Sequence, residues 1–468
     1  MKNYINILII ALLAVFIISC QKEFLEKEPI SQALPEEAQT NAEALLEGAY
    51  AGFYSEYYVF DYCINGDVIS DNSYAGGDNP ANFQIDEFTT NSTNGNIVRD
   101  WGYLFEHIKN CNVVIDYVPL IDNDSLDIGN RRNQIIAEAK FLRAFYHFEA
   151  LRLWGPIPYI SRVPATQEEM QPSRLPVDEV YQKIIADLES ALPDVRINAP
   201  NKGIVTKGAV NAFLARVHAQ KPDGDYNKVL EYCDAVISGN YELIDNYSEL
   251  FDGFHKNSSE SILEIQYGGD GTAHSNWIWW IYLGSGWKKF NTPTNDLVKV
   301  FEEEGDTVRL NTSILFLDSS AEAWTDEYWD KSHYPYIYKY HNEDGSSNVY
   351  MIRLADIILL KAEALNELGY VNDAADLVNQ IRARVNLPNT TASTRETMRE
   401  AILKERRLEL AFEGQRWYDL LRAGKAIEVM NAQEDGEGNN LNYNITEDDL
   451  IWPISQEELD LNPNMTQN

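Results

Sequence analysis

Five aromatic residues stand close together in the sequence, within eleven positions and among several glycines: Trp277, Trp279, Trp280, Tyr282 and Trp287. One face of a sugar ring carries C–H bonds that are apolar and slightly positive, whereas the face of an indole is apolar and negative. Stacking the two removes apolar area from water and gains electrostatic energy. The pattern therefore predicts a platform for sugar rings. Because tryptophan is usually largely buried, we expect about half of the five to lie in the core instead.

Polar side chains that bind ring hydroxyls are expected from two irregular stretches. Residues 66–96 are rich in Asp, Asn, Gly, Ser and Thr, a composition typical of loops and turns. Residues 258–348 show few helix signals and many aromatic residues, which favours an ordered, functional segment over disorder. The expected polar partners in the two stretches are Asp71, Asn72, Tyr74, Asp78, Asn79, Asn276 and Asn291.

A second aromatic group is a weaker candidate for the same role. Its alternation after Tyr334 predicts an extended segment with one aromatic face. The group comprises Trp324, Tyr328, Trp329, Tyr334, Tyr336, Tyr338 and Tyr340.

The sequence contains no pattern typical of catalysis or of tight metal binding. His107 and Cys111 stand one helical turn apart, but they supply only two of the ligands that a metal site needs. The stretch 203–208 begins like a phosphate-binding loop but is not followed by the required Lys and Ser or Thr. The acidic stretches 122–124 and 434–440 are expected to be solvated loops that bind calcium loosely at most. We therefore predict no enzyme activity, no metal site and no cofactor beyond such loosely bound calcium.

The N-terminus has the pattern of a lipoprotein signal peptide. Lys2 precedes an uncharged run, and Ser19 stands directly before Cys20. The run is too short to span a bilayer comfortably, which favours a cleaved signal peptide over an anchor helix. We expect cleavage of residues 1–19, acylation of the Cys20 thiol and a lipidated flexible tether over residues 20–40.

Composition restricts the partners of the mature protein. With 73 acidic and 38 basic residues the formal net charge is -35, so the electrostatic field repels polyanions and makes nucleic acid a poor partner. Direct contact with anionic lipid headgroups is disfavoured as well, which leaves the lipid chains on Cys20 as the expected membrane contact. Cys63, Cys111 and Cys233 are too few and too far apart to predict a disulfide framework.

Helical periodicity dominates the rest of the chain. Several helices form pairs through short loops, as in tetratricopeptide hairpins, which must stack to bury their apolar faces. The sequence thus predicts an all-α dominated fold of tetratricopeptide-like helix pairs with long irregular aromatic-rich loops. Its parts are an N-terminal part over 41–257, the irregular segment 258–348 and a C-terminal helical part over 349–468. Helices are expected over residues 41–58, 97–118, 131–154, 177–192, 206–219, 226–237, 349–368, 371–385 and 395–423.

Several segments carry a more specific signal. Together they resemble the SusD/RagB family of outer-membrane glycan-binding lipoproteins over essentially the whole chain. The strongest is Glu405–Arg422, with the sequence ERRLELAFEGQRWYDLLR. The others are WGYLFEHIKNCN at 101–112, AEAKFLRAFY at 137–146, LWGPIP at 153–158, TKGAVNAFLAR at 206–216, YMIRLADIILLKAEA at 350–364 and WPI at 452–454.

The resemblance implies a helical SusD-like fold and a lipid anchor on the outer membrane, facing the cell exterior. It also implies that the protein is the external lid of a SusC-like TonB-dependent transporter in nutrient uptake, and it does not imply catalysis. In relatives the two irregular regions form the exposed ligand face. A short Gln-Lys-Glu stretch after Cys20 resembles the motif that sends such lipoproteins to the cell surface.

Two functional readings follow from these observations. The favoured one is a non-catalytic lid that binds oligosaccharides on the tryptophan-rich segment. The alternative is a lid that binds peptides or contributes mainly to transporter gating, which the acidic field would also suit. The charged residues of Glu405–Arg422 are interpreted as structural, because they alternate with apolar residues at helical spacing and can pair within and between helices. The alternative for this motif is contact with the transporter. The same structural interpretation applies to Arg143, Tyr146 and Trp154.

Overall fold

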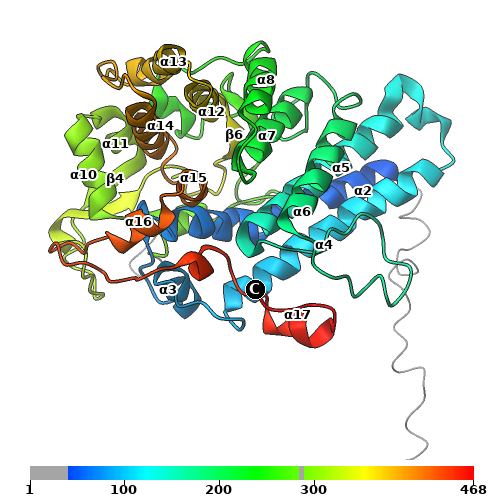
Figure 1. The fold of residues 1–468 in the computed structure, drawn as a ribbon, viewed down its shortest axis with the longest axis horizontal. Helices are drawn as coiled ribbons and strands as arrows, with labels where there is room; N and C mark the ends of the chain where they lie inside the picture. The colour runs from blue at the N-terminus through cyan, green and yellow to red at the C-terminus, as the bar shows by residue number, and fades with distance from the viewer. Residues whose placement is uncertain (1–40, 284–288) are drawn as a thin grey trace, which may run out of the picture.

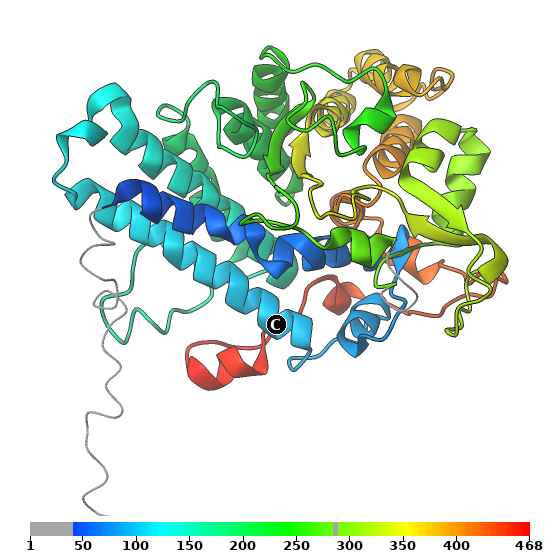
Figure 2. The ribbon, with the colours of Figure 1, turned by 180° about the vertical axis from the view of Figure 1, so that it is seen from behind.

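The computed structural model describes residues 41–283 and 289–468. The predicted signal peptide and tether, with Cys20, and Trp287 in the aromatic segment lie outside this range. Helices make up most of the described chain, and four of them pack together at one end of the molecule (Figures 1 and 2). These four are α2 (Ala42–Tyr50), α4 (Gly95–Tyr117), α5 (Arg131–Trp154) and α6 (Val177–Ala191).

The remaining long helices form stacked hairpins. Helices α7 and α8 pack against each other, α12 packs against α13, and α8 packs against α12, so the two hairpins stack although they are far apart in the sequence. Helix α14 covers the other side of this stack. The five helices are α7 (Lys207–Gln220), α8 (Tyr226–Ile237), α12 (Leu354–Glu367), α13 (Val371–Arg384) and α14 (Arg395–Glu409).

Shorter helices and strands complete the fold. The strands pair antiparallel, as β1 with β3, β2 with β6 and β4 with β5. The first pairing joins the two irregular stretches, with Tyr74 opposite Thr292. The short helices are α3 (Pro80–Asp86), α9 (Ile278–Tyr282), α10 (Asn295–Glu304), α11 (Thr307–Ser313), α15 (Arg416–Arg422), α16 (Ala426–Asn431) and α17 (Gln456–Leu461). The strands are β1 (Ser73–Tyr74), β2 (Ser261–Ile265), β3 (Thr292–Pro293), β4 (Ile314–Leu317), β5 (Tyr334–Ile337) and β6 (Val349–Arg353).

Most predicted helices are confirmed with their local signals. The predicted ranges 131–154 and 226–237 coincide with α5 and α8. Gly155 ends α5 with a φ of 66°, and Gly369 turns between α12 and α13 with a φ of 92°. Arg143, Tyr146 and Trp154 are buried, as their structural interpretation requires. The alternation after Tyr334 is also confirmed as strand β5.

Four expectations about local structure are wrong. Residues 349–353 form strand β6 instead of starting a helix, because they pair with β2. The helix predicted over 395–423 breaks between α14 and α15, where Phe412 and Gly414 have φ values of 64° and 70°. Helix α2 stops at Tyr50 and the chain continues in 3-10 and π turns to Val68. The irregular stretches contain helices α3, α9, α10 and α11.

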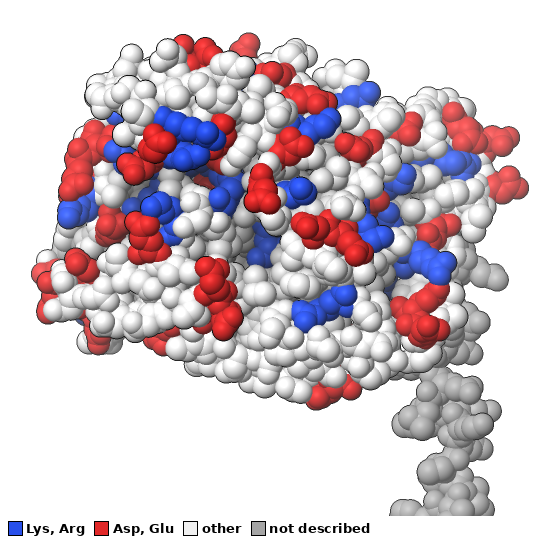
Figure 3. All heavy atoms as spheres, viewed as in Figure 1, with Lys and Arg blue, Asp and Glu red and all other residues white. Residues whose placement is uncertain are grey.

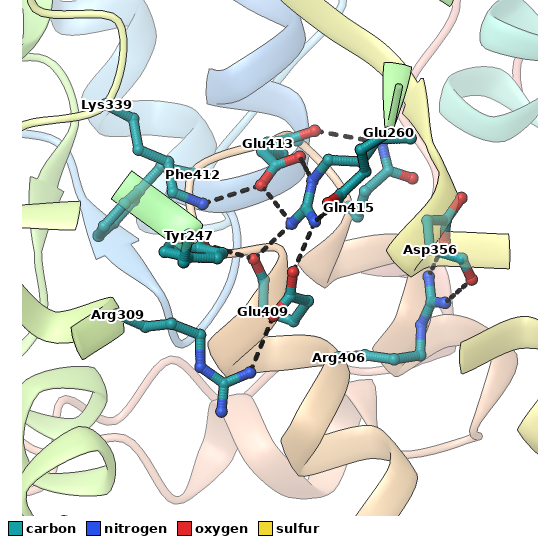
Figure 4. A network of polar contacts seen from close by, with 12 residues as sticks. Tyr247, Glu260, Arg309, Lys339, Asp356, Arg406, Glu409, Phe412, Glu413 and Gln415 are labelled. Carbon is teal, nitrogen blue, oxygen red and sulfur yellow. Dashed lines mark hydrogen bonds and ion pairs between the residues drawn. The ribbon is translucent and has the colours of Figure 1, made fainter. Parts of the chain in front are cut away.

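A buried ionic cluster holds the C-terminal helices to the irregular segment (Figure 4). Arg353, at the end of β6, has a side chain that is 1% exposed. Its guanidinium donates to Glu260 at 2.9 Å, to Glu409 at 2.5 Å and to both oxygens of Glu413 at 2.8 Å. Burial alone would raise the pKa of Glu409, but the neighbouring guanidinium groups outweigh it and hold that pKa well below its ordinary value. The cluster is therefore ionised and mutually neutralised.

The rest of Glu405–Arg422 is paired in the same way, which confirms the structural interpretation of this motif. Arg406 donates to Asp356 at 2.8 Å and to Asp419 at 2.8 Å. Arg416 donates to the two oxygens of Asp71 at 2.7 and 2.8 Å. Because a buried charge without a partner is far more costly than a paired one, each of these residues requires its distant partner.

Replacing Arg353 tests whether the cluster is as tightly coupled as its geometry indicates. We expect Arg353→Met to lower the free energy of unfolding by about 3–5 kcal/mol, because three buried carboxylates lose a shared partner. Arg395→Met is the matched control, since the Arg395 side chain is 44% exposed and pairs with Glu367 at 2.6 Å. The free energy of unfolding of Arg395→Met should fall by less than about 1 kcal/mol. Chemical denaturation of both variants gives the comparison, and equal losses would contradict the central role of Arg353.

Candidate functional site

Helix α9 presents three tryptophans on one surface. Trp277 stands directly before the helix and is 36% exposed, Trp280 is 41% exposed and Trp279 is half-buried. The rings of Trp279 and Trp280 have centres 4.5 Å apart. On the other side of the helix Ile278, Ile281 and Tyr282 are buried, at the spacing of one helical face. We call Trp277, Trp279 and Trp280 the aromatic patch.

Asn276 and Tyr282 fix this helix in place. The Asn276 backbone N–H donates to Gly345 O at 3.0 Å, and its side-chain oxygen accepts from Ile278 N at 3.2 Å. The Tyr282 hydroxyl donates to the Cys63 sulfur at 3.1 Å. Both side chains are 2% exposed. The prediction that they contact a ligand on the surface is therefore wrong, because they are positioning residues beneath the patch.

The polar residues predicted from the first irregular stretch are also buried. Asp71 is 2% exposed and paired with Arg416, and Asn72 donates to Asp67 at 3.0 Å. The Tyr74 hydroxyl donates to Asp326 at 2.8 Å. Contrary to the prediction, Asp71, Asn72 and Tyr74 do not face solvent, because the arginines of α14 and α15 require buried acceptors and Tyr74 belongs to a strand.

The remaining residues predicted to bind ring hydroxyls differ in their exposure. Asp78 is exposed, whereas the Asn79 side chain accepts from Ala81 N at 3.0 Å and begins α3. Asn291 is buried. In the second aromatic group Tyr334, Tyr336 and Tyr340 are buried in the core. The other four members, Trp324, Tyr328, Trp329 and Tyr338, are half-buried.

Residues that sequence spacing did not indicate underlie the patch. The ring of Phe60, in the π turn Tyr57–Asp61, has its centre 5.8 Å from that of Trp277. Figure 2 shows α9, in bright green, beside this blue segment that follows α2, and the two are in contact. The Arg99 guanidinium lies 5.9 Å from the centre of the Phe60 ring. Exposed His274 stacks on Tyr54 with centres 3.5 Å apart and extends the aromatic surface before Trp277. No local signal links Phe60 with Trp277 or Tyr54 with His274, since these contacts join segments about two hundred positions apart.

A buried acid pair lies next to Phe60. Asp61 and Asp100 are both 0% exposed, and the partly exposed Arg99 is bonded to Asp61 and lies 3.6 Å from Asp100. Burial and the nearby Asp100 charge raise the pKa of Asp61 well above its ordinary value. Burial likewise raises the pKa of Asp100 to about 6. One arginine does not neutralise two buried carboxylates, so the pKa values of both are raised and the pair favours a protonated carboxyl more than exposed aspartates do.

Comparison with known proteins gives the same assignment as the sequence motifs. A family model described as "SusD family" matches residues 266–468, and one described as "Starch-binding associating with outer membrane" matches residues 23–218. The chain belongs to the SusD/RagB family. This confirms the resemblance drawn from Glu405–Arg422 and the other motifs.

Relatives of this SusD/RagB protein match over most of their length. SusD-like protein P38 of Formosa agariphila is 29% identical, with 100% of this chain and 99% of that protein covered. The starch-binding protein SusD of Bacteroides thetaiotaomicron is 24% identical over 71% of this chain and 72% of its own. A solved structure described as a laminarin-binding SusD-like protein superposes with a TM-score of 0.76 at 27% identity, covering 91% of this chain and 98% of that one. The predicted SusD-like helical fold is thus confirmed.

The described residues of the SusD/RagB protein offer no group of three or more His, Cys, Asp or Glu that could hold a metal ion. Loosely bound calcium stays a prediction. None of the helices in residues 41–283 and 289–468 is long and apolar enough to cross a membrane.

The acid pair makes stability depend on pH. Because the folded-state pKa values lie above those of the unfolded chain, the pair favours folding most at low pH, and this contribution is lost as the pH rises through the folded-state values. We expect Asp61→Asn, which needs no proton, to be more stable than the natural protein at about pH 8, by on the order of 1 kcal/mol or more. At about pH 4.5 the free energy of unfolding of Asp61→Asn should differ little from that of the natural protein.

Chemical denaturation at both pH values measures this difference. The control is Asp78→Asn, which removes an acidic charge from an exposed position. A gain for Asp61→Asn that is the same at both pH values would show that the acid pair is not protonated in the folded protein.

Proposed function

We propose that the protein is a non-catalytic cell-surface lipoprotein that binds oligosaccharides on the aromatic patch. The observation that carries this proposal is the exposure of large indole rings on a helix whose opposite face is firmly anchored. Exposed apolar clusters on a folded protein usually mark a binding surface. Relatives whose names describe starch or laminarin binding support the choice of glycan as the ligand class.

The shape of the patch suits a chain of sugars better than a single one. Trp277 and Trp280 are exposed on the outer surface of α9, and Trp279 beside them is half-buried. One stacked ring buries little area against the cost of association, whereas several rings engage several sugars. Affinity should therefore rise with oligosaccharide length and then level off.

Polar groups beside the patch are available for ring hydroxyls. His274 and Ser275 precede Trp277 and are exposed, and the Ser275 hydroxyl donates to Asp270 at 3.0 Å. These residues replace the buried Asp71, Asn72 and Tyr74 as the proposed polar contacts. They come from the same irregular segment as the tryptophans, so the binding surface is more local than the sequence analysis predicted.

A cationic peptide is the alternative ligand, favoured by the net charge of -35. Trp-rich surfaces also bind cations, so what favours a glycan is the starch or laminarin binding in the names of relatives. Neighbouring genes offer an independent indication, because glycoside hydrolases would accompany a glycan-binding protein and peptidases a peptide-binding one.

We also propose that the protein is the external lid of a SusC-like TonB-dependent transporter and is held to the outer membrane by lipid on Cys20. The family assignment supports both roles. A lid binds its ligand transiently and passes it on, so moderate affinity and the lack of catalysis are expected of the same protein.

Double replacement Trp279→Ala with Trp280→Ala tests the patch. Loss of stacking should cost on the order of 1 kcal/mol or more, about fivefold or more in oligosaccharide affinity, with nearly unchanged helical circular dichroism. Phe254→Ala is the control, because Phe254 is 87% exposed and lies outside the patch. Isothermal titration against a panel of neutral oligosaccharides gives the affinities, and mass spectrometry after prolonged incubation should recover each glycan intact. Unaltered binding would place the site elsewhere, and reproducible cleavage would indicate an enzyme.

Replacement of Cys20 tests the anchor. The Cys20→Ala protein has no thiol to acylate and should be lost from the outer membrane. Surface labelling of intact cells that express either form measures this, with Cys233→Ala as a control for loss of a buried thiol. Labelling of the Cys20→Ala cells at the natural level would refute lipid anchoring.

A further inference from the structure

The acid pair, Asp61 and Asp100, lies directly behind one edge of the aromatic patch. Asp61 follows Phe60 in the π turn, and the centre of the Phe60 ring is 5.8 Å from that of Trp277. Both aspartates are 0% exposed, whereas Trp277 is 36% exposed. A single buried ring therefore separates two ionisable groups from the surface that is proposed to bind sugars.

The hydrogen bonds of the pair leave two buried oxygens without a donor. Arg99 Nη2 donates to Asp61 Oδ1, and Asn65 Nδ2 donates to Asp100 Oδ2 at 3.1 Å. Within the described part of the chain, Asp61 Oδ2 and Asp100 Oδ1 have no hydrogen-bond partner. Arg99 Nε lies 3.6 Å from Asp100 Oδ1, which is too far for a hydrogen bond. A proton on either carboxyl would supply the missing donor, because the two groups are close enough to bond to each other.

The charged groups around the pair leave it short of positive charge. Within the described chain, the ion pairs of both carboxyls are with Arg99 alone. Glu56, shortly before Phe60, lies 3.8 Å from Arg99 and competes for the same guanidinium. Helix α9 contributes no charged residue. The hydroxyls that face the pair stay neutral at neutral pH, because burial raises the pKa of each, and they belong to Tyr57, Tyr103 and Tyr418.

Arg99 connects the pair with the patch. Its guanidinium lies 5.9 Å from the centre of the Phe60 ring, on which Trp277 packs. The Arg99 side chain is 28% exposed and has room to move, whereas the carboxyls are enclosed. When both carboxyls are ionised, the excess of buried negative charge is costly unless Arg99 shifts toward it or water enters. Either change alters the support of Phe60, and with it the position of Trp277.

We propose that Arg99, Asp61 and Asp100 are positioning residues for the aromatic patch, and that they make oligosaccharide binding depend on pH. The inference rests on the proposed binding of oligosaccharides at the patch. While the pair holds a proton, its carboxyls bond to each other and Arg99 remains beside Phe60, so Trp277 is held for stacking. Loss of the proton weakens this support, and affinity falls as the pH rises. By linkage, a bound oligosaccharide favours uptake of a proton by the pair.

The pH range of this effect follows from the burial of the pair. Burial raises the pKa of Asp100 to about 6, and it also raises the pKa of Asp61. Acidic side chains are spread over the face drawn in Figure 3, but exposed carboxylates titrate around pH 4. A change of binding between about pH 5.5 and 8 therefore reports on buried carboxyls or on imidazoles, and not on the acidic surface.

Isothermal titration with hexasaccharides of starch and of laminarin as probes measures the effect. The affinity of the natural mature protein should fall about fivefold between about pH 5.5 and 8, which is the lower end of the usual coupling between two sites. Asp61→Asn cannot ionise, but it still offers an oxygen to Arg99 and an N–H to Asp100. Its affinity should be nearly the same at both pH values, and close to that of the natural protein at the lower one.

Tryptophan fluorescence tests the positioning without a ligand. The emission of the natural protein minus that of Trp277→Phe isolates Trp277. This emission should change as the pH rises, and measured in the same way in Asp61→Asn it should not. Arg99→Met leaves the pair without its cation and should move the transition to higher pH, because the carboxyls then hold the proton more tightly. Arg99→Lys keeps the charge and should leave the transition close to that of the natural protein.

Two variants test whether other groups cause the effect. Asp86 is another buried aspartate, whose pKa is raised by burial to about 8, and it accepts from Ala75 N at 2.9 Å. Exposed His274 lies beside the patch and stacks on Tyr54. Asp86→Asn and His274→Gln should each keep the natural ratio of affinities between the two pH values.

The outcomes separate this inference from the proposed function. The inference is overturned if affinity is independent of pH, if Asp61→Asn keeps the pH dependence, or if the Trp277 emission does not change with pH. If neither hexasaccharide binds while the Trp277 emission shows a transition that Asp61→Asn abolishes, the positioning role stands and the proposed ligand class fails.

Discussion

Neutralisation of buried charge is the constraint on which the rest of this structure depends. Arg353, Glu409 and Glu413 are almost fully buried, and each of them has more than one partner of opposite charge. Burying an ion costs several kcal/mol unless its partners are placed with good geometry. The partners come from α11, α13, α14, β6 and the residue before β2. These elements must therefore assemble together, and the irregular segment is held to the helical scaffold by charge pairing as well as by apolar packing.

The ionic cluster leads directly to the aromatic patch. Beyond Glu409 the helix breaks, and Phe412 adopts a left-handed conformation at φ 64°. The backbone N–H of Phe412 and that of Gly414 donate to Asp67. The Tyr282 hydroxyl lies 3.4 Å from Phe412 O, so the same break also supports α9. Gly66 must remain glycine here, because a Cβ on it would lie only 2.2 Å from Gly414 O.

Local signals were enough to predict much of the fold, and long-range pairing accounts for most of what was missed. Helix α5 was predicted from its periodicity and from Gly155, both of which act within a few residues. The polar stretch that contains Asp71 looked like a ligand-binding loop, because composition alone does not show that Asp71 is the partner of Arg416, far away in the sequence. Helix α10 was not predicted either, although its signals are local. Its cap was present in the sequence, since the Thr294 side chain accepts from Leu297 N at 3.1 Å and Gly305 ends the helix at φ 70°.

The same limit applies to the binding surface. The type and spacing of the tryptophans are visible in the chain, whereas the burial of Tyr282 follows from the helical face that it shares with Ile278 and Ile281. Stacking on indoles is insensitive to charge, so binding at the aromatic patch can proceed despite the acidic field of the protein.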